Sequence, residues 1–227
     1  MMTTRSIALE LLKAADGPMT MADLKAHGVT KTIMRSLIRA NEVENPAWGV
    51  YRLTSFETNV HSDWALVAKK YPKAVICLLS AASFHNMTQE LPGKLSVAVP
   101  REMGGSPSMG VNQWMLEIDT LMWRNPEMLE LGVEDHMIDG VKVRITSPER
   151  TLVDLFRYST FNPSMRTDQV RITDEMFLES LDRTNSENME HFSFDTVAAI
   201  ARTFKCYDSL RPYTKTVRYV RSEIPSF

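Results

Sequence analysis

Residues 30–40 are TKTIMRSLIRA, and this stretch decides the fold predicted for the first quarter of the chain. On a helical wheel of 100° per residue, one side collects the apolar residues Ile33, Met34, Leu37, Ile38 and Ala40. The other side collects Lys31, Thr32, Arg35, Ser36 and Arg39. Thr30 suits the N-cap position, since its hydroxyl accepts from free N–H groups of the first turn. The pattern predicts an amphipathic helix with a cationic face.

Two more helices are predicted ahead of this one. Thr4–Ala15 has apolar residues at helical spacing and is followed by the helix-stopping sequence Asp16-Gly17-Pro18. Thr20 with Asp23 resembles a capping box, which would open a short helix that ends at Gly28.

A small hairpin is expected after the third helix, with strands over 42–44 and 50–53 and a turn over 45–49. Three helices followed by a hairpin is the element order of a winged helix-turn-helix domain. Lys31, Arg35 and Arg39 would then lie along one ridge of its third helix, at i, i+4 and i+8. Like charges at this spacing repel by a few tenths of a kcal/mol per pair, a cost that a polyanion would offset. The alternative is a small helical bundle that binds nothing.

The ridge suits the major groove of DNA, which admits a helix and offers acceptors to arginine. We therefore expect DNA contacts from one set of residues: Thr30, Lys31, Thr32, Arg35, Ser36 and Arg39. The whole chain has a formal charge of −2, and residues 1–58 hold seven basic and six acidic residues. Because Glu42 and Glu44 lie in the hairpin and affinity depends on phosphate neutralisation, one copy is expected to bind weakly and to need a second copy on repeated half-sites.

We place the domain boundary in the polar segment 54–61, which gives a DNA-binding domain over 1–58 and a second domain over 59–227. The second domain mixes helices and strands, so the fold class is α+β. Helices are expected over 63–71, 80–85, from Ser147-Pro148 onward, 174–182 and 194–208. Strands are expected near 75, over 95–99 and 114–123, and in a hairpin 133–146 turned at Asp139-Gly140.

Composition excludes several classes of protein. Residues 1–15 carry charges among the apolar positions, so no signal peptide is expected, and no apolar run approaches the length of a membrane span. Cys77 and Cys206 are isolated in apolar surroundings, which is typical of reduced thiols in a cytoplasmic protein. The five histidines have no ligand spacing, so neither a metal nor another cofactor is expected.

Several stretches resemble the AbiEi-type antitoxins of type IV toxin–antitoxin systems, which act in abortive infection, a phage defence. They occur in the family's order over about residues 5–160: 49–53, 74–85, 97–101, 132–134, and 139–141 running into 145–158. The most specific segment is Ser147-Pro148-Glu149-Arg150-Thr151-Leu152-Val153-Asp154. The chain departs from the family at Glu44-Asn45-Pro46-Ala47-Trp48, where many relatives carry basic residues.

The resemblance implies a winged helix-turn-helix domain followed by a mixed α/β antitoxin domain. It implies a transcriptional regulator that binds inverted repeats in its own promoter and represses transcription. The C-terminal domain would counter a nucleotidyltransferase-type toxin without a stable complex. On this basis the protein is expected not to be an enzyme.

Two alternatives remain open. One is a repressor whose C-terminal domain only dimerises. The other is a nucleotidyltransferase-like enzyme with a DNA-binding arm, since Gly105-Ser106 precedes Glu117 and Asp119 at a spacing typical of metal-binding carboxylates in such enzymes. Against this, Pro107 and Gly110 interrupt the helix that the motif requires, and we expect the two acids at the solvent rim of a half-buried strand.

Other polar residues receive structural interpretations. His85 has no carboxylate or nucleophile near it in sequence, so a structural role is expected. Arg150 and Asp154 are spaced to pair on one helix, opposite an apolar face. A basic run near the C-terminus is either a solvated face or a second anionic contact, and its members are Arg202, Lys205, Arg211, Lys215, Arg218 and Arg221.

Overall fold

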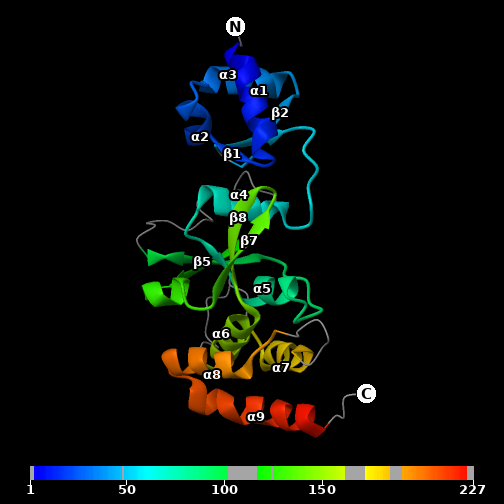
Figure 1. Cartoon of the computed structure of the whole chain (residues 1–227), viewed down its shortest axis with the longest axis vertical. Coiled ribbons are helices and arrows are strands. Elements are labelled where there is room, and N and C mark those ends of the chain that lie inside the picture. Colours follow the sequence, from blue (N-terminus) through cyan, green and yellow to red (C-terminus); the bar gives the residue numbers. More distant parts are fainter. Residues whose placement is uncertain are drawn as a thin grey trace. The chain divides into compact units, whose positions relative to one another are not determined.

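The computed structural model describes residues 3–47, 49–101, 117–123, 125–161, 172–184 and 191–223, with side chains as far as residue 217. The described chain is a mixed α+β structure with two sheets (Figure 1). It divides into two compact units, which we describe separately. The first holds the described residues of Met1–Ala74, Met103–Glu117 and Asp135–Arg144, and the second holds those of Val75–Glu102, Ile118–Glu134 and Ile145–Phe227.

The first unit opens with three helices and a small antiparallel sheet. In chain order these are α1 (Thr4–Ala15), β1 (Met19–Thr20), α2 (Met21–Ala26), α3 (Lys31–Arg39), β2 (Val43–Ala47) and β3 (Val50–Leu53). The strand order is β1-β3-β2. The helices and β2 share one apolar core of Ala8, Leu12, Leu24, Val29, Met34, Leu37 and Val43.

The sequence signals for helix starts are confirmed in this unit. The Thr20 hydroxyl accepts from the Asp23 N–H, and the Asp23 carboxylate accepts from the Thr20 N–H, so the capping box is complete. Thr30 caps α3 by accepting from the Ile33 N–H at 3.4 Å. These caps satisfy N–H groups that a helix leaves without internal partners.

The structure adds a detail to the predicted helix and corrects the predicted hairpin. Ile38 is 38% exposed and Ala40 is also exposed, because only the narrow stripe through Met34 and Leu37 reaches the core. The first strand of the hairpin does not end at residue 44 but continues to Ala47 through a bulge. The Asn45 side chain stabilises this path, donating to the carbonyls of Ala47 at 2.7 Å and Val50 at 2.6 Å.

The first unit extends beyond residue 58. Helix α4 (Ser62–Lys70) packs against β1 and β3 with a buried face that includes Trp64, and Lys69 Nζ lies 3.0 Å from the Asp23 carboxylate. Burial of this face excludes apolar area from water, which ties α4 to the first unit.

The larger sheet has the order β6-β5-β4-β8-β7. Its strands are β4 (Val75–Ile76), β5 (Leu95–Pro100), β6 (Ile118–Trp123), β7 (Val133–Ile138) and β8 (Val141–Thr146). β4 runs antiparallel to β5, and β5 runs parallel to β6. The predicted hairpin turned at Asp139-Gly140 is confirmed as β7 and β8, with both turn residues at positive φ.

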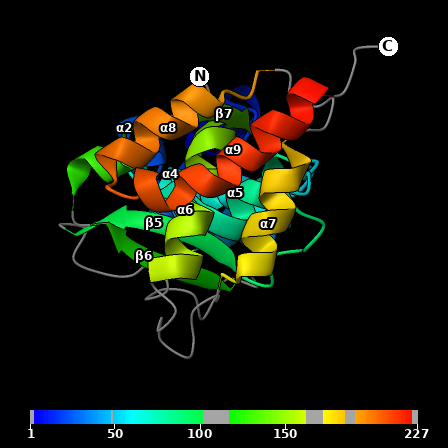
Figure 2. The ribbon, with the colours of Figure 1, turned by 90° about the horizontal axis from the view of Figure 1, so that it is seen from below.

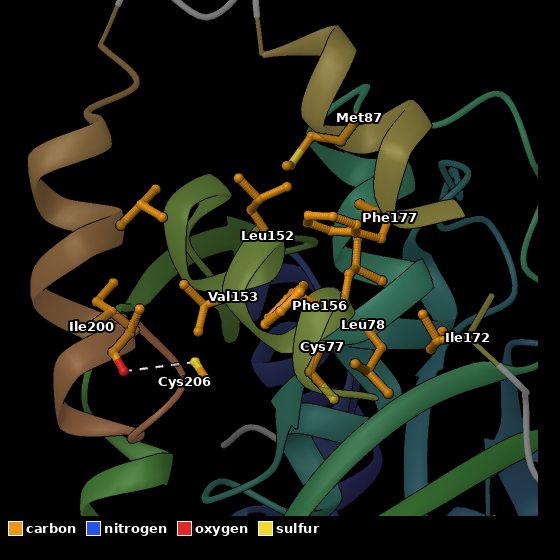
Figure 3. Packing of buried hydrophobic residues seen from close by; sticks show 14 of the residues in the cluster. Cys77, Leu78, Met87, Leu152, Val153, Phe156, Ile172, Phe177, Ile200 and Cys206 are labelled. Atoms are coloured by element: carbon orange, nitrogen blue, oxygen red, sulfur yellow. Dashed lines mark hydrogen bonds between the residues drawn. The ribbon is translucent and has the colours of Figure 1, made fainter. Parts of the chain in front are cut away.

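Helices contribute much of the apolar core of the second unit. They are α5 (Leu78–Phe84), α6 (Pro148–Phe161), α7 (Asp174–Arg183), α8 (Phe194–Thr203) and α9 (Tyr207–Glu223), with a short 3-10 helix η3 at Pro126–Leu129. α7 and α8 pack on α6, and α9 packs on both (Figure 2). Phe156, Phe177 and Leu152 lie at the centre of their shared core (Figure 3).

One helix expected from the sequence is two. A single helix over 194–208 is wrong, since the chain leaves α8 after Thr203 and Lys205 adopts a φ of 56° before α9 begins. The left-handed residue turns the chain, so α9 packs back on α8 instead of extending it. Among the described helices, none combines the length and the apolar character that a membrane crossing requires.

Candidate nucleic-acid interface

The polar face of α3 lies at the surface of the first unit. Met34 and Leu37 are completely buried and fix the rotation of the helix. As a result Lys31, Thr32, Arg35, Ser36 and Arg39 are all exposed, together with the cap residue Thr30. The predicted contact residues thus share one accessible face, which we call the α3 ridge.

The cations of the α3 ridge form no ion pair with an acid among the described residues. Within the described residues, no carboxylate lies within 4.0 Å of the charged groups of Lys31, Arg35 or Arg39. Their charge is therefore available to an anion, and each guanidinium offers a planar set of N–H donors that fits phosphate or a guanine edge.

The hairpin after α3 differs in charge from the α3 ridge, because it carries acidic residues. Glu44 forms an ion pair with Arg52 across the two strands, and Glu42 forms one with Arg5 of α1. Both acids that the sequence placed here are thus ion-paired within the first unit. The Arg52 side chain is ion-paired and only 14% exposed, so this arginine is a poor phosphate ligand.

Two further exposed residues of the first unit were not among the predicted contacts. Lys25, in the last turn of α2, is exposed and has no ion pair among the described residues. Ile38 lies on the apolar side of the helical wheel but is partly accessible, and an accessible aliphatic group on such a helix can contact a thymine methyl. Helical periodicity alone does not reveal this exposure, because Ile38 lies at the edge of the apolar stripe.

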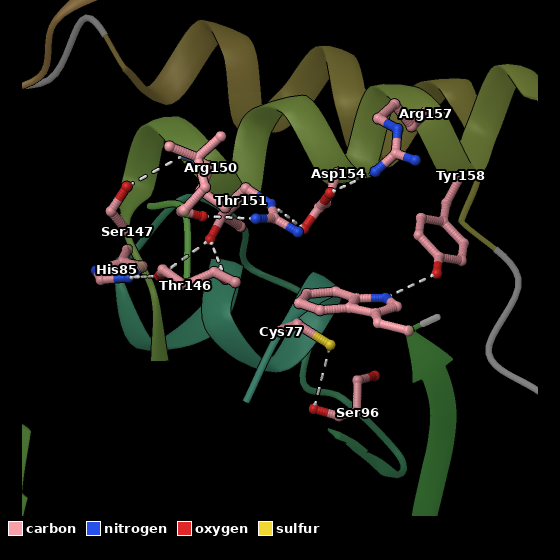
Figure 4. Close-up of polar contacts among 12 residues, drawn as sticks. Cys77, His85, Ser96, Thr146, Ser147, Arg150, Thr151, Asp154, Arg157 and Tyr158 are labelled. Atoms are coloured by element: carbon pink, nitrogen blue, oxygen red, sulfur yellow. Dashed lines mark hydrogen bonds and ion pairs between the residues drawn. The ribbon is translucent and has the colours of Figure 1, made fainter. Parts of the chain in front are cut away.

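The second unit contains a buried polar cluster on α6 (Figure 4). Arg150 and Asp154 are both 0% exposed and pair at 2.8 Å, while Arg157 reaches the other oxygen of Asp154 at 3.2 Å. Arg150 also donates to the Leu131 carbonyl at 2.6 Å. Its guanidinium lies 4.6 Å from the Trp123 ring centroid and 4.3 Å from that of Phe204.

The sequence predicted the Arg150–Asp154 pair correctly but placed it wrongly on an open face opposite the core. Every residue from Glu149 to Phe156 is buried, because α5, α7 and α8 surround the first turns of α6. Close packing also explains Gly132, where a Cβ would lie 2.7 Å from the Arg150 Cβ. The cluster is therefore part of the core of the second unit.

Two thiols and a phenol near this cluster are held protonated. Burial, followed by the nearby Asp154 charge, raises the pKa of Cys77, and burial raises the pKa of Cys206 to about 11. Burial and Asp154 also raise the pKa of Tyr158, whose oxygen accepts a hydrogen bond from the Trp123 indole at 3.2 Å. Reactive thiols need the opposite shift, so neither cysteine is poised as a nucleophile.

His85 has the structural contact expected of it. Its Nε2 lies 2.7 Å from the Thr146 carbonyl oxygen, and since a carbonyl only accepts, Nε2 carries the proton and donates. This bond joins the end of α5 to the end of β8.

The two acids of the nucleotidyltransferase-like pattern differ in exposure. Glu117 is exposed, whereas Asp119 is only 4% exposed, so the expectation that both lie at the solvent rim is wrong. The alternation of β6 explains this, since Asp119 shares the buried face of Leu121 and Trp123. Gly105 and Ser106 lie outside the described residues. In the described part of the chain, no three potential ligands cluster as a metal site.

The C-terminal cations are spread over two helices. Arg211 and Lys215 are exposed on α9, Lys205 is exposed in the preceding turn, and Arg202 stacks on the Tyr207 ring at 4.3 Å. The side chains of Arg218 and Arg221 lie outside the described residues. The second anionic contact remains a prediction.

Comparisons with known proteins give a likeness in fold. The structure resembles the crystal structure of the Rv2827c protein from Mycobacterium tuberculosis, with a TM-score of 0.52 at 14% sequence identity. The match covers 89% of this chain and 72% of that one. No protein-family model and no curated protein match the sequence. At this identity the match supports a shared fold over most of the chain.

Proposed function

We propose that the protein is a transcriptional regulator that binds DNA through the first unit, with the α3 ridge in the major groove. The observation that carries the proposal is the set of exposed cations on α3 that have no acidic partner among the described residues. The element order α1-β1-α2-α3-β2-β3 supports the proposal, because it fits the order expected of a winged helix-turn-helix, in which the third helix would read DNA. The ridge is at the surface because Met34 and Leu37 anchor the opposite face.

We further propose the role that the AbiEi resemblance implies: an antitoxin that represses its own operon at inverted repeats and counters a nucleotidyltransferase-type toxin. The Ser147–Asp154 segment, which carries most of the resemblance, forms the start of α6 and the centre of the buried cluster. A segment in this position would maintain the fold of the antitoxin domain rather than contact the toxin directly.

Promoter binding is the direct test. Fluorescence anisotropy with the DNA upstream of the gene should show Arg35→Ala with Arg39→Ala weakening binding at least about tenfold, since each lost base or phosphate contact costs on the order of 1–3 kcal/mol. The matched control is Lys13→Ala with Lys73→Ala, which removes two exposed cations from other parts of the same unit. Equal loss in both double variants, or no loss in either, would remove α3 from the interface.

A further inference from the structure

The ion pair between Arg5 and Glu42 joins two charges that each lie near the unfavourable end of a helix dipole. Arg5 is in the first turn of α1, at the positive end of the helix dipole, and that turn holds no acid. Glu42 follows the C-terminus of α3, and its N–H donates to the Leu37 carbonyl at 3.0 Å, so its charge is close to the negative end of α3. Each side chain therefore depends on the other for compensation.

This ion pair is exposed. The side chains of Arg5 and Glu42 are 45% and 38% exposed, and exposed ion pairs contribute little to stability. An incoming phosphate can therefore compete with Glu42 for Arg5 at small cost. Glu42 also lies only three residues after Arg39, so Arg5 is held near the C-terminal end of the α3 ridge.

The hairpin pair offers a contrast within the same unit. Arg52 is only 14% exposed while its partner Glu44 is 41% exposed, so the guanidinium is buried against the hairpin. Arg52 serves the packing of the hairpin.

We propose that Arg5 is a further phosphate-binding residue, held in reserve by Glu42, and that it extends the α3 ridge when DNA displaces the carboxylate. The inference rests on the proposed DNA binding. Glu42 competes with DNA phosphate for Arg5 and so lowers the affinity for DNA of any sequence. The base contacts of α3 then contribute a larger share of the binding free energy. The partner class is duplex DNA, contacted at one backbone phosphate beside the groove that α3 occupies.

The test is a double-mutant cycle on DNA affinity in the full chain, with Arg5→Ala, Glu42→Gln and both together. Freeing Arg5 in Glu42→Gln should tighten binding by about two- to fivefold, the scale of the exposed ion pair that DNA must otherwise break, and should steepen the slope of log K against log salt by at most about 0.9. Arg5→Ala alone should change affinity less than about twofold, but in the Glu42→Gln background it should remove most of the gain. The parallel cycle of Arg52→Ala and Glu44→Gln should show no such coupling.

The outcomes separate the two proposals. If Arg5→Ala costs the same in both backgrounds, the gain in Glu42→Gln is general relief of repulsion and Arg5 is not a reserve ligand. Coupling of equal size in the Arg52–Glu44 cycle would also overturn the assignment. If the Arg35 and Arg39 double variant binds as tightly as the wild type, the proposed α3 interface fails first, whatever the Arg5 cycle gives.

Discussion

Asp154 shows how a single residue connects the parts of the second unit. Its carboxylate is 0% exposed and accepts from Arg150 on one oxygen and Arg157 on the other. Phe204, which follows α8, lies against both guanidiniums, at 4.3 and 4.7 Å from its ring centroid. One buried anion thus holds two cations that also pack on aromatic rings, and this ties α6 to the end of α8.

Asp154→Asn should destabilise the protein by about 3–5 kcal/mol, because it leaves buried Arg150 without a counter-charge. Urea denaturation followed by circular dichroism measures the change. Asp182→Asn is the control, since Asp182 is an exposed carboxylate on α7, and its effect should stay within about 0.5 kcal/mol. A similar loss of stability in both variants would contradict this prediction, because the Arg150–Asp154 pair would then not account for the effect.

At the scale of the element, helix α2 depends on its capping box. Helices this short are marginal on their own, so α2 relies on its N-terminal cap and on the burial of Leu24. Asp23 loses some solvation on burial, yet its pKa is lowered by the Thr20 N–H, the Lys69 ammonium and the Thr20 hydroxyl. The same carboxylate therefore starts α2 and links it to α4.

This lowered pKa gives a pH dependence with a definite sign. The Asp23 contribution to stability is present above the ordinary value of 3.8 and is lost as pH falls through the lower folded-state pKa. Asp23→Asn should therefore destabilise the chain at pH 7, with the difference from wild type shrinking toward pH 3. Denaturation midpoints at several pH values check this, with Glu10→Gln, an exposed acid of α1, as the control. A difference that is constant with pH would contradict it.

At the scale of the whole molecule, the two units divide the chain differently from the sequence boundary at residue 58. A fragment beginning at Asn59 would keep α4, whose residues are largely buried, but lose β1 and β3, on which this helix packs. The exposed apolar face of α4 would favour aggregation. Substitutions in the full chain therefore separate the proposed functions better than truncation.

Full-length Arg35→Ala with Arg39→Ala should lose promoter repression and still relieve the growth defect caused by the partner toxin. The reason is that both side chains are exposed on the first unit, so the fold of the second unit stays intact. A promoter–reporter assay and a growth-rescue assay in the same cells measure the two activities. Loss of both activities in a folded, equally abundant variant would contradict the assignment of antitoxicity to the second unit.

Local sequence patterns determined much of what the structure contains. The capping residues, the limits of α1, the Asp139-Gly140 hairpin and the cationic face of α3 follow from neighbours a few residues apart, and these predictions agree with the structure. Such features depend on backbone hydrogen bonds and helical periodicity, which the sequence displays directly. The Arg150–Asp154 pair was predictable for the same reason, because i and i+4 meet on any helix.

Burial and long-range pairing were decided by the tertiary structure alone. Asp119 is buried because its side of β6 faces the core, and Ile38 is accessible because the core reaches only one stripe of α3. Arg5 and Glu42 are 37 residues apart in the sequence, so no local pattern connects them. Periodicity tells which residues share a face, but which face is covered, and by which distant side chain, is settled only when the elements pack together.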